Sequence, residues 1–141
     1  MAKQTKKQGR KKKYFYAVGR RKQAVTTVKL FEGKGDFLVN GISIDKYFPG
    51  RTAEVHYKKP FSLSDSEGKF HAEARIVGGG KVSQLEALVL AFSRALVKYN
   101  SPVYRPILKK AGLLTVDARV KERRKAGQMG KARKKKQSPK R

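Results

Sequence analysis

Two short groups of residues in this chain could bind phosphate. Residues 19–22 (Gly-Arg-Arg-Lys) set three cations in a predicted turn, where forked guanidinium groups and backbone amides match phosphate geometry. Residues 78–81 (Gly-Gly-Gly-Lys) stand before a predicted helix, whose first amides and dipole favour an anion. The alternatives are a solvated basic turn and a tight strand-to-helix turn, and the second group lacks Walker A spacing. The candidate residues are Arg20, Arg21, Lys22, Gly78, Gly79, Gly80 and Lys81.

The last 23 residues, 119–141, form a third basic group. They hold twelve Lys or Arg, one acid (Glu122) and no aromatic residue. Such a segment buries too little apolar surface to fold alone, and a polyphosphate is the partner that matches it. Gly127 and Gly130 allow sharp bends, so the tail is predicted to wind between RNA segments. Its candidate RNA contacts are Arg119, Arg123, Arg124, Lys125, Lys131 and Arg133.

The sequence gives little support to other chemistry. The chain has no cysteine, which excludes disulfides and thiolate metal sites. The two histidines, His56 and His71, have no metal-ligand spacing around them, and the ten acidic residues are scattered. We therefore expect no metal, no cofactor and no acid–base catalysis.

The charge is concentrated at the two ends of the chain. Residues 1–13 and 119–141 together hold +18 of the formal net charge of +26. We expect a basic, disordered extension over 1–13, one globular domain over 14–115 and an extended basic tail over 116–141. The longest apolar run, 87–92, is far too short to span a membrane. An organelle transit peptide is an alternative interpretation of the basic start, although the folded pattern begins almost at once.

Alternating apolar and polar residues predict four strands, at 14–18, 24–31, 37–39 and 70–77. The turn signals between the first three arrange them as an antiparallel meander. One side of the fourth strand would face solvent or RNA. Most aromatic residues fall on core-like faces, and base stacking by Tyr14 or Tyr16 is the alternative to packing.

Helical periodicity predicts the elements that cover the sheet. Ser43 begins a short helical turn, 52–58 is weakly helical and 62–68 is predicted to be a polar loop. The strongest helix follows the three glycines, with Ser83 and Glu86 as a capping box and an apolar stripe from Leu85 to Tyr99. Another short helix starts at 101–102 (Ser-Pro) and ends near Gly112. The order predicts an α/β (α+β) fold, a two-layer sandwich.

Several of these segments resemble small-subunit ribosomal protein nine of the bacterial type. No single segment is diagnostic, but the ordered set is specific and runs over nearly the whole chain. The matching residues are 19–25, Asn40-Gly41, Tyr47-Phe48, Pro60, 77–80 with Gln84, 93–96, 108–112, 114–119, 122–125, 131–133, Ser138, Lys140 and Arg141.

The resemblance implies a fold, a place and partners. The fold is β-β-β-α-β-α with a left-handed crossover, like the second domain of ribosomal protein five. The place is the head of the small ribosomal subunit, on small-subunit ribosomal RNA beside neighbouring head proteins, in a cytoplasmic or an organellar ribosome. The tail would reach the peptidyl-site transfer RNA, where Lys140 and Arg141 would contact phosphate.

The expected function is structural and not enzymatic. The domain would dock a basic face on folded RNA by shape and backbone contacts, and the tail would order on binding. Two rival functions come from other classes. Composition allows a free, histone-like nucleic-acid binder, and the glycine turn at 78–80 allows a small phosphotransferase, which lacks a matched loop and a base. No membrane partner is expected.

Overall fold

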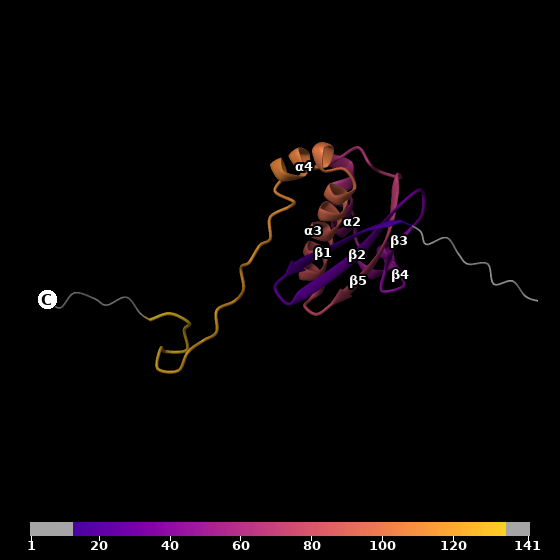
Figure 1. Cartoon of the computed structure of the whole chain (residues 1–141). Coiled ribbons are helices and arrows are strands. Elements are labelled where there is room, and N and C mark those ends of the chain that lie inside the picture. Colours follow the sequence, from indigo (N-terminus) through magenta and orange to yellow (C-terminus); the bar gives the residue numbers. More distant parts are fainter. Residues whose placement is uncertain (1–12, 135–141) are drawn as a thin grey trace, which may run out of the picture.

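The computed structural model describes residues 13–134, which form one sheet and a layer of helices on it (Figure 1). The strands are β1 (Tyr14–Arg21), β2 (Ala24–Glu32), β3 (Phe37–Val39), β4 (Ile42–Ser43) and β5 (Phe70–Val77). The helices are α1 (Ile44–Tyr47), α2 (Arg51–Leu63), α3 (Lys81–Tyr99) and α4 (Ser101–Lys110). The predicted two-layer α/β class is confirmed, and α4 is the helix expected from its Ser-Pro start.

The strands lie in the order β1-β2-β5-β3-β4. β1 and β5 both pair with β2 in antiparallel fashion, and the β2–β5 pairing runs from Val25 opposite Val77 to Glu32 opposite Phe70. β3 pairs in parallel with the other edge of β5, and β4 pairs with β3. The connection from β3 to β5 passes through α1 and α2, as a crossover requires. Its left-handed sense stays a prediction of the family resemblance.

The predicted meander is therefore wrong for the third strand. β3 has only three residues, whereas β5 offers eight residues to β2. Because the longer ladder satisfies more backbone donors and acceptors, β5 takes the place beside β2 and leaves β3 to pair with its far edge. Alternation in the sequence identifies a strand but not its partner.

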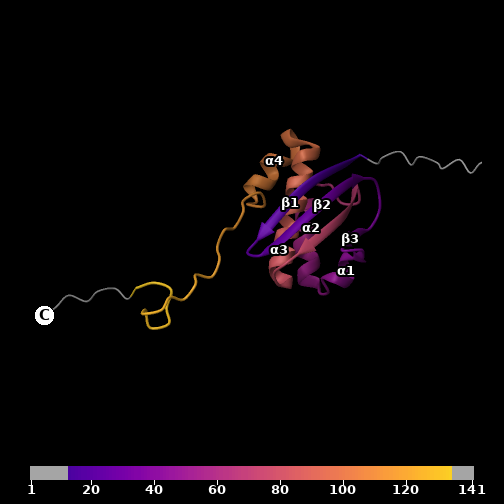
Figure 2. The same ribbon diagram turned by 60° about the horizontal axis from the view of Figure 1, so that its bottom comes forward.

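One face of the sheet carries the core, and the opposite face is left open (Figure 2). α3 lies across β1 and β2, and α2 and α4 pack against α3. This confirms the predicted apolar stripe of α3. Within residues 13–134, no helix is long and apolar enough to cross a membrane. The fully buried side chains include Val28, Leu30, Val39, Leu88, Phe92, Leu96 and Leu108.

α2 is longer than the sequence predicted, because it continues past 52–58 and through Pro60. Proline inside a helix removes one backbone hydrogen bond. Here Pro60 and Phe61 are buried, and the Phe61 ring lies 5.1 Å from the Phe37 ring and 5.2 Å from the Phe92 ring. This aromatic packing outweighs the lost hydrogen bond and extends the helix into the predicted loop.

The predicted capping box of α3 is wrong. The helix begins at Lys81, its N-cap residue is Gly80, and no side chain caps it. Ser83 therefore lies inside the first turn. Glu86 reaches instead to Arg21 of β1, because a carboxylate gains more from a guanidinium than from an exposed backbone amide.

Gly19 sets the distance between β1 and α3. A Cβ at this position would lie 1.9 Å from the carbonyl oxygen of Ala87 and 2.7 Å from the amide nitrogen of Ala91. Because both are backbone atoms, the strand and the helix would have to separate. We predict that Gly19→Ala lowers the free energy of unfolding by about 3 kcal/mol, measured by urea denaturation.

Gly80→Ala is the matched control, since a Cβ there has no neighbouring atom within 4 Å. We expect a loss of about 1 kcal/mol or less, from the poorer N-cap. Equal losses for the two variants would show that close packing is not what Gly19 provides.

Candidate nucleic-acid interface

Arg21, the last residue of β1, joins three separate parts of the chain. Its Nε lies 2.5 Å from Oε2 of Glu86 on α3, and its Nη1 lies 3.0 Å from Oδ1 of Asp117, beyond α4. Nη1 also donates to the carbonyl oxygens of Asp117 and Arg119, at 3.3 Å and 3.0 Å. The Arg21 side chain is only 12% exposed. We call Arg21, Glu86 and Asp117 the anchor.

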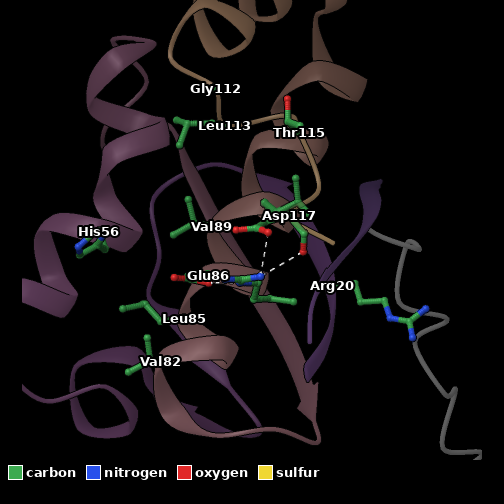
Figure 3. Close-up of a pocket in the computed structure, with 12 residues that line it drawn as sticks. Arg20, His56, Val82, Leu85, Glu86, Val89, Gly112, Leu113, Thr115 and Asp117 are labelled. Atoms are coloured by element: carbon green, nitrogen blue, oxygen red, sulfur yellow. Dashed lines mark hydrogen bonds and ion pairs between the residues drawn. The ribbon is translucent and has the colours of Figure 1, made fainter. Parts of the chain in front are cut away.

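The anchor lies in a groove of about 280 Å³ between α3 and the segment that follows α4. Figure 3 shows Glu86 and Asp117 pointing toward the same place from these two elements, with the apolar side chains of Leu85 and Val89 lining the groove beside them. Both carboxylates share one guanidinium, so neither is available as a general base. The groove therefore holds the root of the tail in place.

The basic turn is shorter than predicted. β1 continues through Arg21, which pairs with Ala24, so only Lys22 and Gln23 form the turn. Lys22 takes the left-handed conformation, with φ 51°. The guanidinium of Arg21 is engaged within the protein, so the predicted three-cation clamp becomes two exposed cations, Arg20 and Lys22. Figure 3 shows Arg20 pointing away from the groove.

The glycine turn lies directly against the basic turn. Gly78 and Gly79 have φ values of 75° and 67°, and a Cβ on Gly78 would lie 2.5 Å from the carbonyl oxygen of Gln23. A Cβ on Gly79 would lie 2.9 Å from the Cβ of Ala24. The close approach of two backbones requires these glycines, as the tight-turn interpretation expected. The two turns thus lie side by side, and we call their exposed residues the turn patch: Arg20, Lys22, Gly78, Gly79, Gly80 and Lys81.

Tyr47 and Gln84 support the turn patch through hydrogen bonds. The Tyr47 hydroxyl donates to Oε1 of Gln84 at 3.1 Å, and Nε2 of Gln84 donates to the carbonyl oxygen of Gly78 at 3.0 Å. Nζ of Lys81 lies 3.4 Å from the Tyr47 ring centroid, a cation–π distance. Reasoning from residue types missed this network, because it joins α1 to α3. Only the family resemblance singled out Tyr47 and Gln84.

The tail leaves the body after α4 and runs away from it (Figures 1 and 2). Arg119 folds back on Asp117, with Nε to Oδ1 at 3.0 Å and Nη2 to Oδ2 at 2.7 Å. These bonds, with a smaller effect from Arg21, hold the pKa of Asp117 well below its usual range. Lys140 and Arg141 lie outside the described residues. Arg123, Arg124, Lys125 and Lys131 are exposed, and Arg133 pairs with Glu122.

Tyr14 and Tyr16 stand on the open face of the sheet, 49% and 45% exposed. Nζ of Lys29 lies 5.5 Å from the Tyr14 ring centroid. Base stacking by either tyrosine stays a prediction. His71 stacks on Phe31 with ring centroids 5.1 Å apart, and within residues 13–134 no cluster of His or acidic residues could hold a metal ion.

Residues 19–141 match the family model described as ribosomal protein S9/S16. The chain belongs to the ribosomal protein S9/S16 family. It is therefore a structural constituent of the ribosome and not an enzyme, as the resemblance implied. The phosphotransferase interpretation of the glycine turn is set aside.

Three S9/S16 relatives each carry the name small ribosomal subunit protein uS9. The protein of Cutibacterium acnes is 46% identical over 89% of this chain and 72% of its own length. That of Maridesulfovibrio salexigens is 46% identical over 84% of this chain and 91% of its own. That of Methylacidiphilum infernorum is 49% identical over 81% of this chain and 83% of its own. The similarity therefore extends over most of each protein.

The anchor predicts different roles for two adjacent arginines. Arg21→Met leaves Glu86 and Asp117 without their shared cation in a half-buried groove, so we expect the free energy of unfolding to fall by about 1–3 kcal/mol. Arg20→Met removes the same charge from an exposed side chain and should change it by less than about 0.5 kcal/mol. Urea denaturation of the two variants measures the difference. If both unfold like the wild type, the anchor contributes nothing to stability.

Proposed function

We propose that this structural ribosomal protein binds small-subunit ribosomal RNA in the head of the small subunit, with its turn patch and its tail as one surface. We propose further that its last residues reach the peptidyl-site transfer RNA. The expected setting is a cytoplasmic ribosome, with an organellar ribosome as the alternative. Neighbouring head proteins complete the proposed set of partners.

The observation that carries this proposal is the position of the tail root. Arg21 of β1 donates hydrogen bonds to the start of the tail at Asp117 and Arg119, and Arg20 and Lys22 flank Arg21 in sequence. The anchor therefore starts the tail next to the strand that carries Arg20 and Lys22, and we propose that the tail cations and the turn patch bind RNA together. A continuous run of cations fits the closely spaced phosphates of folded RNA.

The two parts of the chain would bind RNA differently. The body, 14–115, presents a turn patch braced by Tyr47 and Gln84, which suits recognition of the RNA backbone by shape. The tail, 116–141, contributes charge and little apolar surface, so we expect its path along the RNA to be fixed by its partner. If about six tail cations neutralise phosphates, the logarithm of the affinity should fall with log salt at a slope of roughly −4 to −5.

The end of the tail would act on transfer RNA by charge alone. Lys140 and Arg141 are its last two cations, and the family resemblance is the basis for proposing them as the residues that reach the peptidyl site. They would steady the bound transfer RNA through its phosphates, with no bond made or broken.

Sedimentation tests the ribosomal assignment against the histone-like alternative. We expect tagged protein from cell lysate to migrate with the small subunit in stoichiometric amount, at low salt and at moderately high salt, because its tail is enclosed by RNA. Free protein, or protein stripped by salt from mixed nucleic acid, would favour a general basic binder. Equal affinity for duplex DNA and small-subunit ribosomal RNA would do the same.

A charge-matched pair of variants tests the transfer-RNA contact. We predict that changing Lys140 and Arg141 to Gln weakens peptidyl-site transfer-RNA binding to reconstituted small subunits about tenfold, from the loss of two charge-assisted contacts. Changing Lys135 and Lys136 to Gln removes the same charge upstream and should weaken it less than about twofold. Filter binding measures both. The same loss in both variants would mean that only total charge matters.

A further inference from the structure

Glu122 is the one acid among the last 23 residues, and the structure gives it a partner. Nη2 of Arg133 lies 2.5 Å from its Oε1, and Nε of Arg133 lies 2.9 Å from its Oε2. Two parallel bonds between a guanidinium and a carboxylate fix direction as well as distance. The pair holds together two points of the tail that are eleven residues apart.

The residues between Glu122 and Arg133 form a closed loop, visible toward the end of the tail in Figures 1 and 2. The amide of Lys125 donates to the carbonyl oxygen of Lys131 at 3.1 Å, and the amide of Lys131 donates to that of Gln128 at 3.0 Å. Gly127, Met129 and Gly130 have φ values of 75°, 54° and 71°, so three left-handed residues reverse the chain. We call 122–133 the tail loop.

The tail loop is electrostatically unfavourable without its acid. Arg123, Arg124, Lys125 and Lys131 are all exposed on it, and Lys134 follows at its neck. Arg123, Lys125 and Lys134 line one side-chain hollow together with Glu122 and Arg133. Like charges at this density extend a free chain. An acid at the neck offsets that repulsion at the place where the two ends of the loop must meet.

We propose that the Glu122–Arg133 pair is a clasp, which pre-forms the tail loop so that its cations meet the phosphates of ribosomal RNA together. Glu122 is then a positioning residue that acts through Arg133 and touches no phosphate itself. This inference rests on the RNA binding proposed above. Its physical basis is that a loop shaped before binding loses less conformational freedom on binding.

Charge alone leads to the opposite expectation for Glu122. An acid in a polycationic tail repels RNA, so its removal should strengthen binding. If the Glu122–Arg133 pair acts as a clasp, losing Glu122 also opens the tail loop, and this weakens binding to RNA. A simple Glu122→Gln variant mixes these two effects, so the test must keep the net charge constant.

Two double variants of the full chain keep the net charge and move the acid. Lys121→Glu with Glu122→Lys shifts the acid by one residue, to a side chain that points the other way along an extended segment. Glu122→Arg with Arg133→Glu reverses the pair and keeps it. We expect the shifted acid to lower the affinity for purified small-subunit ribosomal RNA about two- to fivefold, the range of an exposed ion pair, and the reversed pair to bind like the wild type.

A distance measurement in the absence of RNA reports the clasp directly. The chain has no cysteine, so Val120→Cys and Lys134→Cys introduce two unique positions for spin labels at the neck of the loop. We expect a short, narrow distance distribution in the otherwise unchanged chain and in the reversed pair, and a long, broad one with the shifted acid.

The possible results separate this inference from the function on which it rests. Equal RNA affinity of all three proteins, or tighter binding with the shifted acid, would overturn the clasp and leave RNA binding intact. A broad neck distance in the unchanged chain would overturn it as well. If the wild type itself bound small-subunit ribosomal RNA no better than duplex DNA, the proposed function would fail first.

Discussion

The ion pairs at Arg21 hold the start of the segment that follows α4 against the body of the protein. A chain with a formal net charge of +26 repels itself, and a basic tail would by charge alone move away from a basic turn. The carboxylates of Glu86 and Asp117 reverse this locally, since both meet the guanidinium of Arg21 in a half-buried groove. The chain has only ten acidic residues, but a few of them lie where an ion pair holds two parts of the fold together.

The acids that do this work share a geometry. Glu86 and Asp117 hold one arginine, Asp117 also holds Arg119, and Glu122 holds Arg133. In each case the partner is a guanidinium, whose fixed fork gives direction, whereas the exposed lysines are point charges on flexible stems. Through these ion pairs, arginine side chains help to determine the shape of the protein, in addition to the RNA binding proposed for them. Within residues 13–134, Arg20 and Lys22 make no such bond and are exposed.

Local sequence patterns predicted most of the individual helices, strands and turns. The four strands β1, β2, β3 and β5, the apolar stripe of α3 and the short α4 follow from periodicity, and the glycine turn follows from its composition, whereas the two-residue strand β4 was not predicted. Periodicity does not predict the partner of β3, the extension of α2 through Pro60 or the role of Glu86, because contacts between residues far apart in the sequence determine them. Arg21 and Asp117 are 96 residues apart, so no spacing rule could pair them. The motif at 19–22 predicted a clamp of three cations; the structure pairs Arg21 within the protein, and the RNA contacts of the motif stay a prediction.

The strand order also determines when the sheet can be completed during synthesis. β1 and β2 are neighbours in sequence and can pair at once, but the free edge of β2 has to wait until β5 has been made. An open strand edge can recruit the edge of another chain. Lys29 stands exposed in the middle of β2, opposite Glu73 in the finished sheet. A charged side chain on an open strand edge disfavours pairing with a second copy, and Lys29 supplies such a charge until Glu73 has been made.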